Sequence, residues 1–308
     1  MSRAKNLIAA TLATVAIGLT SIGIVGEHMS NKGLERPKKN PTEYSVSLHN
    51  HTTNLKLEDD KSLEAFVDSA FKNDLDVVAL TDSDTDENFY YLRDNSNKIL
   101  EDYITKDIGN DVLEIIEKED PNEILYLIKG QEFHRKQGHI LVIGYDGKLA
   151  FNEKASPEDV INIGKENNAI VIIPHPFTTL LGSAGLGRER LEKYYKEVDA
   201  IESFNAMSIY FLPGLDASKY NRDAKEFCKE KGIPGISSSD SRAIDQIGCA
   251  YMLIEKKELN FDNGKSLIDS VRTAVKDKKF KNYEGYFTWM SFVKFQIVGR
   301  INIAKGKH

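Results

Sequence analysis

Short runs of β-branched residues alternate with amphipathic helical stretches from residue 43 onward, and this alternation most restricts the possible folds. Helical patterns cover 62–73, 156–168, 189–198 and 216–232, the second opening with Ser156 and Pro157 as is typical of a helix start. Strand and helix in alternation predict an α/β fold with a parallel sheet covered by helices, either open or closed into a barrel. The strands that we predict are 44–49, 76–81, 124–132, 139–145, 169–174, 200–204, 233–238 and 250–255.

Polar residues with metal-binding or acid–base chemistry fall at or just beyond the ends of these predicted strands. In a closed α/β barrel the carboxyl ends of the strands share one face, and that face carries the chemistry. We therefore expect the functional site there, and we expect the long connection 83–122 to cover it. The residues at the strand ends are His49, Asp82, Glu132, His175, Glu202 and Asp240.

The composition is that of a globular protein, with 41% apolar residues in a chain of 308. The formal charge of -6 gives no general attraction to nucleic acid or to anionic lipid. An anionic substrate would have to be held by local cations or by metal ions. We therefore expect a small or locally recognised partner and no extended nucleic-acid surface, and no protein partner is evident.

The N-terminus predicts an export signal. Residues 1–27 begin with a positively charged stretch and continue through an uncharged, mostly apolar segment that ends before Glu27. We interpret this segment as a signal peptide or a membrane anchor, followed by a linker at 28–42 and a barrel domain at 43–308 with an extension from about 256. A buried core helix is the alternative. The body of the protein is then expected outside the cytoplasm, either tethered to the membrane through the N-terminal segment or secreted.

The cysteine content leaves metal binding to other residue types. Only Cys228 and Cys249 are present, either as buried thiols or as one disulfide, so a zinc-type cysteine cluster is excluded. His49 and His51 are alternate residues of a predicted strand, which places both side chains on one face about 7 Å apart.

The histidine pair alone is a weak signal, because such pairs are common on protein surfaces. Further segments strengthen it: "TDSDT", "GQEFHRKQGH", "IPHP" and "SSSDS" each place a carboxylate or imidazole after an apolar strand. An unpaired charge in such a position is costly unless it meets a partner or an ion. Together these segments predict a metal site.

These segments resemble, in order, the motifs of the PHP domain, the polymerase and histidinol phosphatase superfamily of metal-dependent phosphoesterases. "SLHNHTT" resembles the first motif, "DVVALTDSDT" the second, "GQE" with "GHILVIGY" the third, "IPHP" the fourth and "SSSDSRAIDQIG" the last. The resemblance spans about residues 43 to 255. It implies a distorted seven-stranded (β/α)7 TIM-like barrel, preceded here by one N-terminal hydrophobic helix, with a metal cluster at the C-terminal face.

The resemblance also implies a ligand set. One metal would be surrounded by His49, His51, Glu132 and Asp240. Glu132 would bridge to a second metal, completed by His139 and His175, and Asp82 would orient a ligand. Imidazoles and carboxylates together suit zinc, manganese or iron, so the expected cofactors are two divalent metal ions.

The departures from the family pattern all concern one of the family's metal sites. Ser83 and Arg242 stand where the family usually has histidine, and Asn54 and Lys56 stand near the position of a further ligand. These positions build the family's third metal site, so their joint loss indicates a protein that works with two ions. Arg242 would then hold phosphate oxygens in place of the lost metal, or it would only pair with Asp240 or Asp84.

Other residues carry weaker expectations. Arg188 follows a glycine-rich loop after the fourth motif and is a candidate phosphate contact, or an arginine that faces water. His134, two residues after Glu132, could reach the site, but an exposed position beside Arg135 and Lys136 is expected. Glu202 is a candidate for orienting a ligand, and Asn205 for contacting the substrate.

The leading functional hypothesis is a hydrolase that cleaves a phosphomonoester or phosphodiester with metal-activated water at a dinuclear centre. One alternative is a nuclease acting on short nucleic acids. Another is a barrel that binds metal or ligand without turnover. The physiological substrate, the metal and the oligomeric state stay open at this stage.

Overall fold

The computed structural model of the chain describes residues 40–52, 60–149, 154–178, 185–208, 211–212, 215–216, 218–288 and 291. The expected signal peptide or anchor at 1–27 lies outside these ranges, as does most of the linker at 28–42. Among the described residues, none of the helices combines the length and the apolar character needed to cross a membrane.

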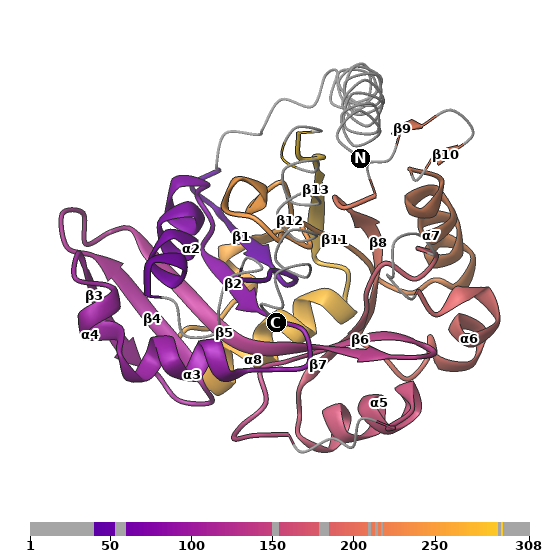
Figure 1. Ribbon diagram of the computed structural model, residues 1–308, viewed down its shortest axis with the longest axis horizontal. Coiled ribbons are helices and arrows are strands. Elements are labelled where there is room, and N and C mark those ends of the chain that lie inside the picture. Colours follow the sequence, from indigo (N-terminus) through magenta and orange to yellow (C-terminus); the bar gives the residue numbers. More distant parts are fainter. Residues whose placement is uncertain are drawn as a thin grey trace, which may run out of the picture.

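Strands and helices alternate along the body of the chain, as the sequence pattern predicted (Figure 1). The strands are β1 (Glu43–Ser47), β2 (Val77–Leu80), β3 (Tyr103–Asp107), β4 (Val112–Glu117), β5 (Ile124–Arg135), β6 (Gly138–Ile143), β7 (Ile170–Ile173), β8 (Ala200–Asn205), β9 (Phe211–Leu212), β10 (Leu215–Asp216), β11 (Gly235–Ser238), β12 (Ala250–Glu255) and β13 (Phe280–Glu284). The helices are α2 (Asp60–Lys72), α3 (Glu87–Asp94), α4 (Ser96–Ile99), α5 (Pro157–Glu166), α6 (Gly187–Tyr194), α7 (Ser218–Lys231) and α8 (Gly264–Lys276), with short 3₁₀ turns η1 (Ile244–Gln246) and η2 (Lys256–Glu258).

The main sheet runs in the order β11-β8-β7-β6-β5-β2-β1-β12-β13. Parallel ladders join β1 to β2, β2 to β5, β7 to β8 and β8 to β11. Strands β6, β12 and β13 are antiparallel to their neighbours. The sheet is therefore parallel-rich rather than fully parallel, because the chain returns directly from β5 to β6 without an intervening helix.

The two end strands of the sheet come together, so the barrel is nearly closed. β11 lies beside β12 and β13, but side chains rather than a backbone ladder connect them. The Ser237 backbone N–H donates to Asn282 Oδ1 at 2.9 Å, and Asn282 Nδ2 donates to the Gly235 carbonyl at 2.8 Å. Ser239 Oγ similarly bonds the backbone N–H and carbonyl of Ala250. We call this junction the seam.

The strands are buried on both faces, which explains their nearly continuous apolar sequences. Ile128 and Leu141 point into the barrel and belong to one interior cluster. Their neighbours point outward. Leu127 packs under α2 and α3, and Val142 packs under α5, α6 and α7.

The region 83–122 differs from the expectation that it covers the site. Helix α3 does approach the strand ends, but β3 and β4 form a hairpin that pairs with the first half of β5 and extends the sheet sideways. Ile104 in this hairpin is 53% exposed. Most of this long connection is therefore an addition to the sheet, at the side of the molecule seen in Figure 1.

The described part of the segment after residue 256 contributes to the core through α8 (Gly264–Lys276). Helix α8 contributes Leu267, Ile268 and Val271 to the same interior cluster that the barrel strands build. Asn263 caps its first turn by accepting from the Ser266 backbone N–H at 2.9 Å. The predicted fold class, an α/β barrel, is confirmed, and α8 is packed against the inside of that barrel.

Candidate metal centre

Four of the polar residues identified in the sequence share one position relative to their strands. His49, Asp82, His175 and Asp240 each lie two residues beyond the last residue of β1, β2, β7 and β11. The parallel strands therefore deliver these side chains to a common face. His175 and Asp240 have φ angles of 28° and 47°, a left-handed backbone conformation that costs energy for residues other than glycine and is frequent at functional sites.

Glu132 lies at the centre of the cluster, on the inner face of the long strand β5, and is fully buried. Its Oε1 lies 3.0 Å from His139 Nδ1, 2.9 Å from His175 Nε2 and 3.6 Å from His49 Nε2. Its Oε2 lies 3.4 Å from His51 Nε2. A single carboxylate therefore joins four imidazoles from three segments of the chain.

Asp240 is a second carboxylate that contacts both His49 and His51. Its Oδ1 lies 3.5 Å from His49 Nε2 and 3.3 Å from His51 Nε2, and the two Nε2 atoms are 3.1 Å apart. Backbone bonds fix this geometry, because the Asp240 N–H donates to the His49 carbonyl and the His51 N–H donates to the Ser241 carbonyl. The six residues that the PHP resemblance assigned as ligands are thus brought together in one buried cluster: His49, His51, Glu132, His139, His175 and Asp240.

The histidines of the cluster have opposite electrostatic environments. Burial lowers the pKa of His49, but Asp240, Glu202 and Glu132 outweigh burial and raise it well above its ordinary value. For His51, burial and the Arg242 guanidinium together lower the pKa to about 3. Without a cation, the cluster therefore mixes charged and neutral imidazoles.

Burial also lowers the pKa of His139, to about 4. The carboxyl of Glu132 would have a raised pKa from burial alone, but His49 and the hydrogen bonds from His134, His139 and His175 hold it well below its usual range. Glu132 is consequently a carboxylate at neutral pH.

Glu202 fixes the orientation of His49. Its Oε1 lies 2.7 Å from His49 Nδ1, which leaves Nε2 directed toward Glu132 and Asp240. Glu202 is itself held by the Ser238 hydroxyl and by the His175 backbone N–H at 2.8 Å. Carboxylates that hold the second nitrogen of a metal-binding histidine play this orienting role.

Asn205 does not face a substrate space. Its amide donates to Glu202 Oε2 at 2.9 Å and to Asp240 Oδ2 at 3.1 Å, and the residue is buried. The expectation of a substrate contact is therefore wrong for Asn205, which instead holds two carboxylates in place.

Asp82 secures the end of the first motif. The Thr52 backbone N–H donates to Asp82 Oδ1 at 2.8 Å, and the Thr52 hydroxyl donates to Oδ2 at 2.6 Å. Asn88 from α3 donates to Oδ2 at 2.8 Å. His51 Nδ1 is farther away, at 3.9 Å from Oδ1, so Asp82 acts on the backbone that carries His51.

Arg242 lies against the cluster and pairs with two of its carboxylates. One terminal nitrogen lies 3.1 Å from Glu132 Oε2 and 3.2 Å from Asp240 Oδ1. The side chain is 21% exposed, so the guanidinium borders both the buried carboxylates and the solvent side. Asp84, named among the alternatives as an acidic partner, pairs instead with Arg135 at 2.8 Å.

His134 is partly exposed and also reaches the site, which its position two residues after Glu132 allowed. Its Nε2 lies 2.7 Å from Glu132 Oε2, and its ring stacks on that of His139 with centroids 4.0 Å apart. The side chain is 34% exposed, at the rim of the cluster. The alternation along β5 could have revealed this, since His134 is two residues after Glu132 on the same face.

Arg188 is not brought to the cluster. Its guanidinium pairs with Glu230 at 2.5 Å and approaches Glu192 at 3.8 Å, on the surface of α6 and α7. The side chain is 55% exposed, so the candidate role as a phosphate contact is not supported. The middle of the glycine-rich loop, 179–184, lies outside the described residues.

The donor set fits a divalent metal centre. Three overlapping groups place potential ligand atoms within 4.8 Å of one another: His49, His51 and Glu132; His49, His175 and Asp240; and Glu132, His134 and His139. The buried Nδ1 of His175 has no hydrogen-bond partner among the described residues. Buried imidazoles that converge on carboxylates suit zinc, iron or manganese and are a poor match for calcium.

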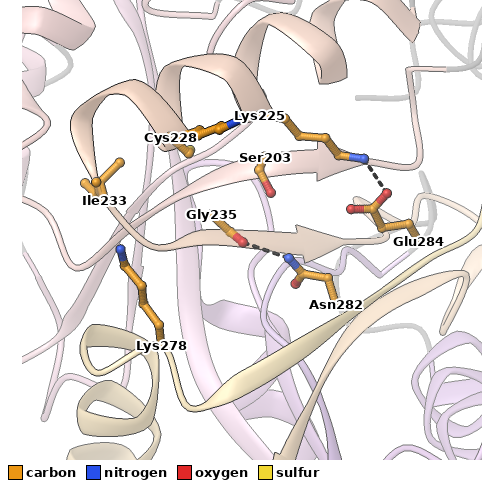
Figure 2. Close-up of a pocket in the computed structure, with 10 residues that line it drawn as sticks. Ser203, Lys225, Cys228, Ile233, Gly235, Lys278, Asn282 and Glu284 are labelled. Carbon is orange, nitrogen blue, oxygen red and sulfur yellow. Dashed lines mark hydrogen bonds and ion pairs between the residues drawn. The ribbon is translucent and has the colours of Figure 1, made fainter.

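A cavity of about 470 Å³ lies elsewhere, between α7 and the outward faces of β8 and β11 (Figure 2). Ser203 and Gly235 line its floor, with Lys225 paired to Glu284 at its mouth. Burial raises the pKa of the Cys228 thiol beside it to about 12, so this cysteine is not a thiolate at neutral pH. The two cysteines do not form a disulfide, and this cavity shares no residue with the histidine and carboxylate cluster.

The fold and the site define an α/β barrel with a buried imidazole and carboxylate centre at the carboxyl ends of its strands. A family model described as PHP-associated matches residues 218–274. The chain is similar to a two-domain protein of Bacteroides vulgatus described as containing a predicted PHP-like metal-dependent phosphoesterase, at 17% identity and a TM-score of 0.52 over 82% of this chain and 68% of that one. It is also similar to PsfC from Pseudomonas syringae, at 14% identity and a TM-score of 0.56 over 84% of this chain and 97% of that one. No curated protein sequence matches significantly.

These likenesses confirm the recognition of the PHP superfamily that the sequence motifs suggested. At such low identities the solved structures establish the fold. The matched segment 218–274 extends beyond residue 255, where the motif resemblance ended, and it includes most of α8.

Proposed function

We propose that the chain is a metal-dependent hydrolase of phosphoric esters, with two divalent cations held by His49, His51, Glu132, His139, His175 and Asp240. The observation that carries this proposal is the fully buried Glu132 carboxylate, whose two oxygens contact imidazoles from both sides of the cluster. A carboxylate in this position is suited to bridge two cations. The similarity to a PHP-like metal-dependent phosphoesterase supports the same reaction class.

Divalent cations bound there would supply a water of lowered pKa and positive charge for the phosphoryl oxygens. The protein's own part is to orient the ligands. Glu202 fixes the His49 ring so that Nε2 faces the site, and Asp82 holds the backbone on which His51 sits. Arg242 reaches the exposed side of the cluster, where its planar guanidinium is suited to bind two phosphate oxygens.

One observation favours a second candidate, a barrel that binds metal without turnover. Arg242 pairs with Glu132 and Asp240, which are two of the residues proposed to hold cations. If Arg242 keeps these contacts when metal is present, it occupies space that a substrate phosphate needs. The proposed hydrolase requires Arg242 to turn toward the substrate.

The experiment that separates these functions measures metal content and hydrolysis together. Protein freed of metal and reloaded with Mn²⁺, Zn²⁺ or Fe²⁺ is assayed with a chromogenic phosphomonoester and a chromogenic phosphodiester. We expect bound metal with turnover of at least one ester, and we expect Glu132→Gln to lose both. Glu158→Gln, at an exposed ion pair on α5, is the matched control and should keep both.

Bound metal with no turnover of either ester would favour the binding role. Absence of bound metal after reloading would overturn both functions. A positive result should be followed by a screen of nucleotides, sugar phosphates and dinucleotides, because the site fixes the reacting group and leaves the rest of the substrate open. The proposed setting is outside the cytoplasm, with the N-terminal segment as anchor or signal and a small phosphorylated substrate as partner.

A further inference from the structure

The hairpin of β5 and β6 carries one histidine more than the family motifs assigned to the site. Within this hairpin, His134 is directly opposite His139 in the antiparallel register. Glu132 and His134 are alternate residues of β5, so their side chains leave the strand on the same face. The hairpin therefore presents three potential ligands together: Glu132, His134 and His139.

The distances agree with this placement. His134 Nε2 is 2.7 Å from Glu132 Oε2, and His139 Nδ1 is 3.0 Å from Glu132 Oε1. The potential ligand atoms of these three residues lie within 4.8 Å of one another. The two imidazole rings are stacked, with centroids 4.0 Å apart and 12° between their planes, so both side chains leave the hairpin on the same face.

The backbone of His134 is held in place by a neighbouring turn. The Asp84 N–H donates to the Glu132 carbonyl at 2.9 Å, and Asp84 Oδ1 accepts from the His134 N–H at 3.1 Å. Arg135 donates to the same Asp84 oxygen at 2.8 Å. Both ends of the Glu132 to His134 segment are thereby fixed, which is the preorganisation that a ligand position needs.

We propose that His134 is an additional ligand of the cation held by Glu132, His139 and His175. This inference rests on the proposed function and adds a donor to it. Three imidazoles and one carboxylate form a nitrogen-rich set, which favours zinc or iron over manganese at this position. Since His134 is 34% exposed, it closes the solvent side of the position.

The test is metal affinity rather than activity. Metal-free protein is titrated with Zn²⁺ in competition with a chromogenic chelator, and with Co²⁺ while its visible absorption spectrum is recorded. We expect His134→Ala to weaken the binding of one equivalent of metal by at least about tenfold and to change the Co²⁺ absorption spectrum. Lys136→Ala, an exposed position in the same hairpin turn, should bind as the wild type does.

The outcomes are distinguishable from failure of the proposed function. A wild-type chain that binds no Zn²⁺ or Co²⁺ would overturn the proposed function and this inference with it. A wild-type chain that binds metal, with unchanged affinity and spectrum in His134→Ala, would overturn this inference alone. His134→Gln, closer to histidine in size, serves as a second variant, and thermal melting of the metal-free proteins checks that each variant is folded.

Discussion

Replacing Arg242 with methionine should destabilise the metal-free protein much more than the metal-loaded protein. Methionine keeps much of the side-chain length and removes the charge, leaving Glu132 and Asp240 without their guanidinium partner. Removing one partner of a buried ion pair costs about 3–5 kcal/mol. Both carboxylates retain imidazole neighbours and Arg242 is 21% exposed, so we expect a loss at or below the lower limit of this range, about 2–3 kcal/mol.

The assay is urea unfolding at neutral pH, with a chelator in one series and saturating Zn²⁺ or Mn²⁺ in the other. With metal bound, the cations neutralise the same carboxylates, so the loss for Arg242→Met should shrink. Arg188→Met is the matched control, because it removes an arginine from a solvent-exposed pair with Glu230 and should change neither series measurably.

Two results would refute this reasoning. Unchanged stability of metal-free Arg242→Met would show that the guanidinium contacts contribute nothing. A larger loss in the metal-loaded series would show that Arg242 supports the loaded site rather than substituting for it. The same variant also tests the phosphate contact, since a higher KM or lower kcat for a phosphoester is expected and unchanged kinetics would exclude it.

Further perturbations test other parts of the site and core. The free energy of unfolding of the metal-free protein should be highest near pH 6.5. The folded-state pKa of His139 is lowered to about 4, so its contribution to stability is lost as the pH falls below 6.5. The folded-state pKa of His49 is raised, so its contribution is lost as the pH rises above 6.5. Melting temperatures from pH 4 to 9 in chelator check this, and a flat profile would contradict it. Glu202→Gln should weaken metal binding about 10- to 100-fold by releasing the His49 ring, measured by chelator competition with exposed Glu197→Gln as control. Ile268→Ala should lower the free energy of unfolding by about 2–5 kcal/mol in urea, because α8 is packed into the barrel; a loss below about 1 kcal/mol would mean that this helix is dispensable.

The strands and the cluster were predictable because local pattern and strand-end position carry the information. A buried apolar run followed two residues later by His or Asp is visible in the sequence, as at His49 and Asp240. The family motifs then connect segments that lie nearly two hundred residues apart. Strand direction was less predictable, because β6 follows β5 through a short turn and only the register shows that it pairs antiparallel within the barrel.

Residues whose roles depend on tertiary contacts were only partly predictable. His134 reads as a surface histidine beside Arg135 and Lys136, and only the alternation along β5 argues otherwise. Asn205 has the polarity expected of a substrate contact, yet its hydrogen bonds go to Glu202 and Asp240. In both cases the sequence gives the chemistry of the side chain, whereas the tertiary structure decides what it meets.

The seam determines where local opening of the barrel is easiest. β11 has a backbone ladder with β8 on one side but only side-chain bonds through Asn282 and Ser239 on the other. Segments with fewer backbone bonds open at lower free energy than the rest of a sheet, and this one leads directly into Asp240 and Arg242. Amide protons of β11 should therefore exchange with solvent faster than those of β5.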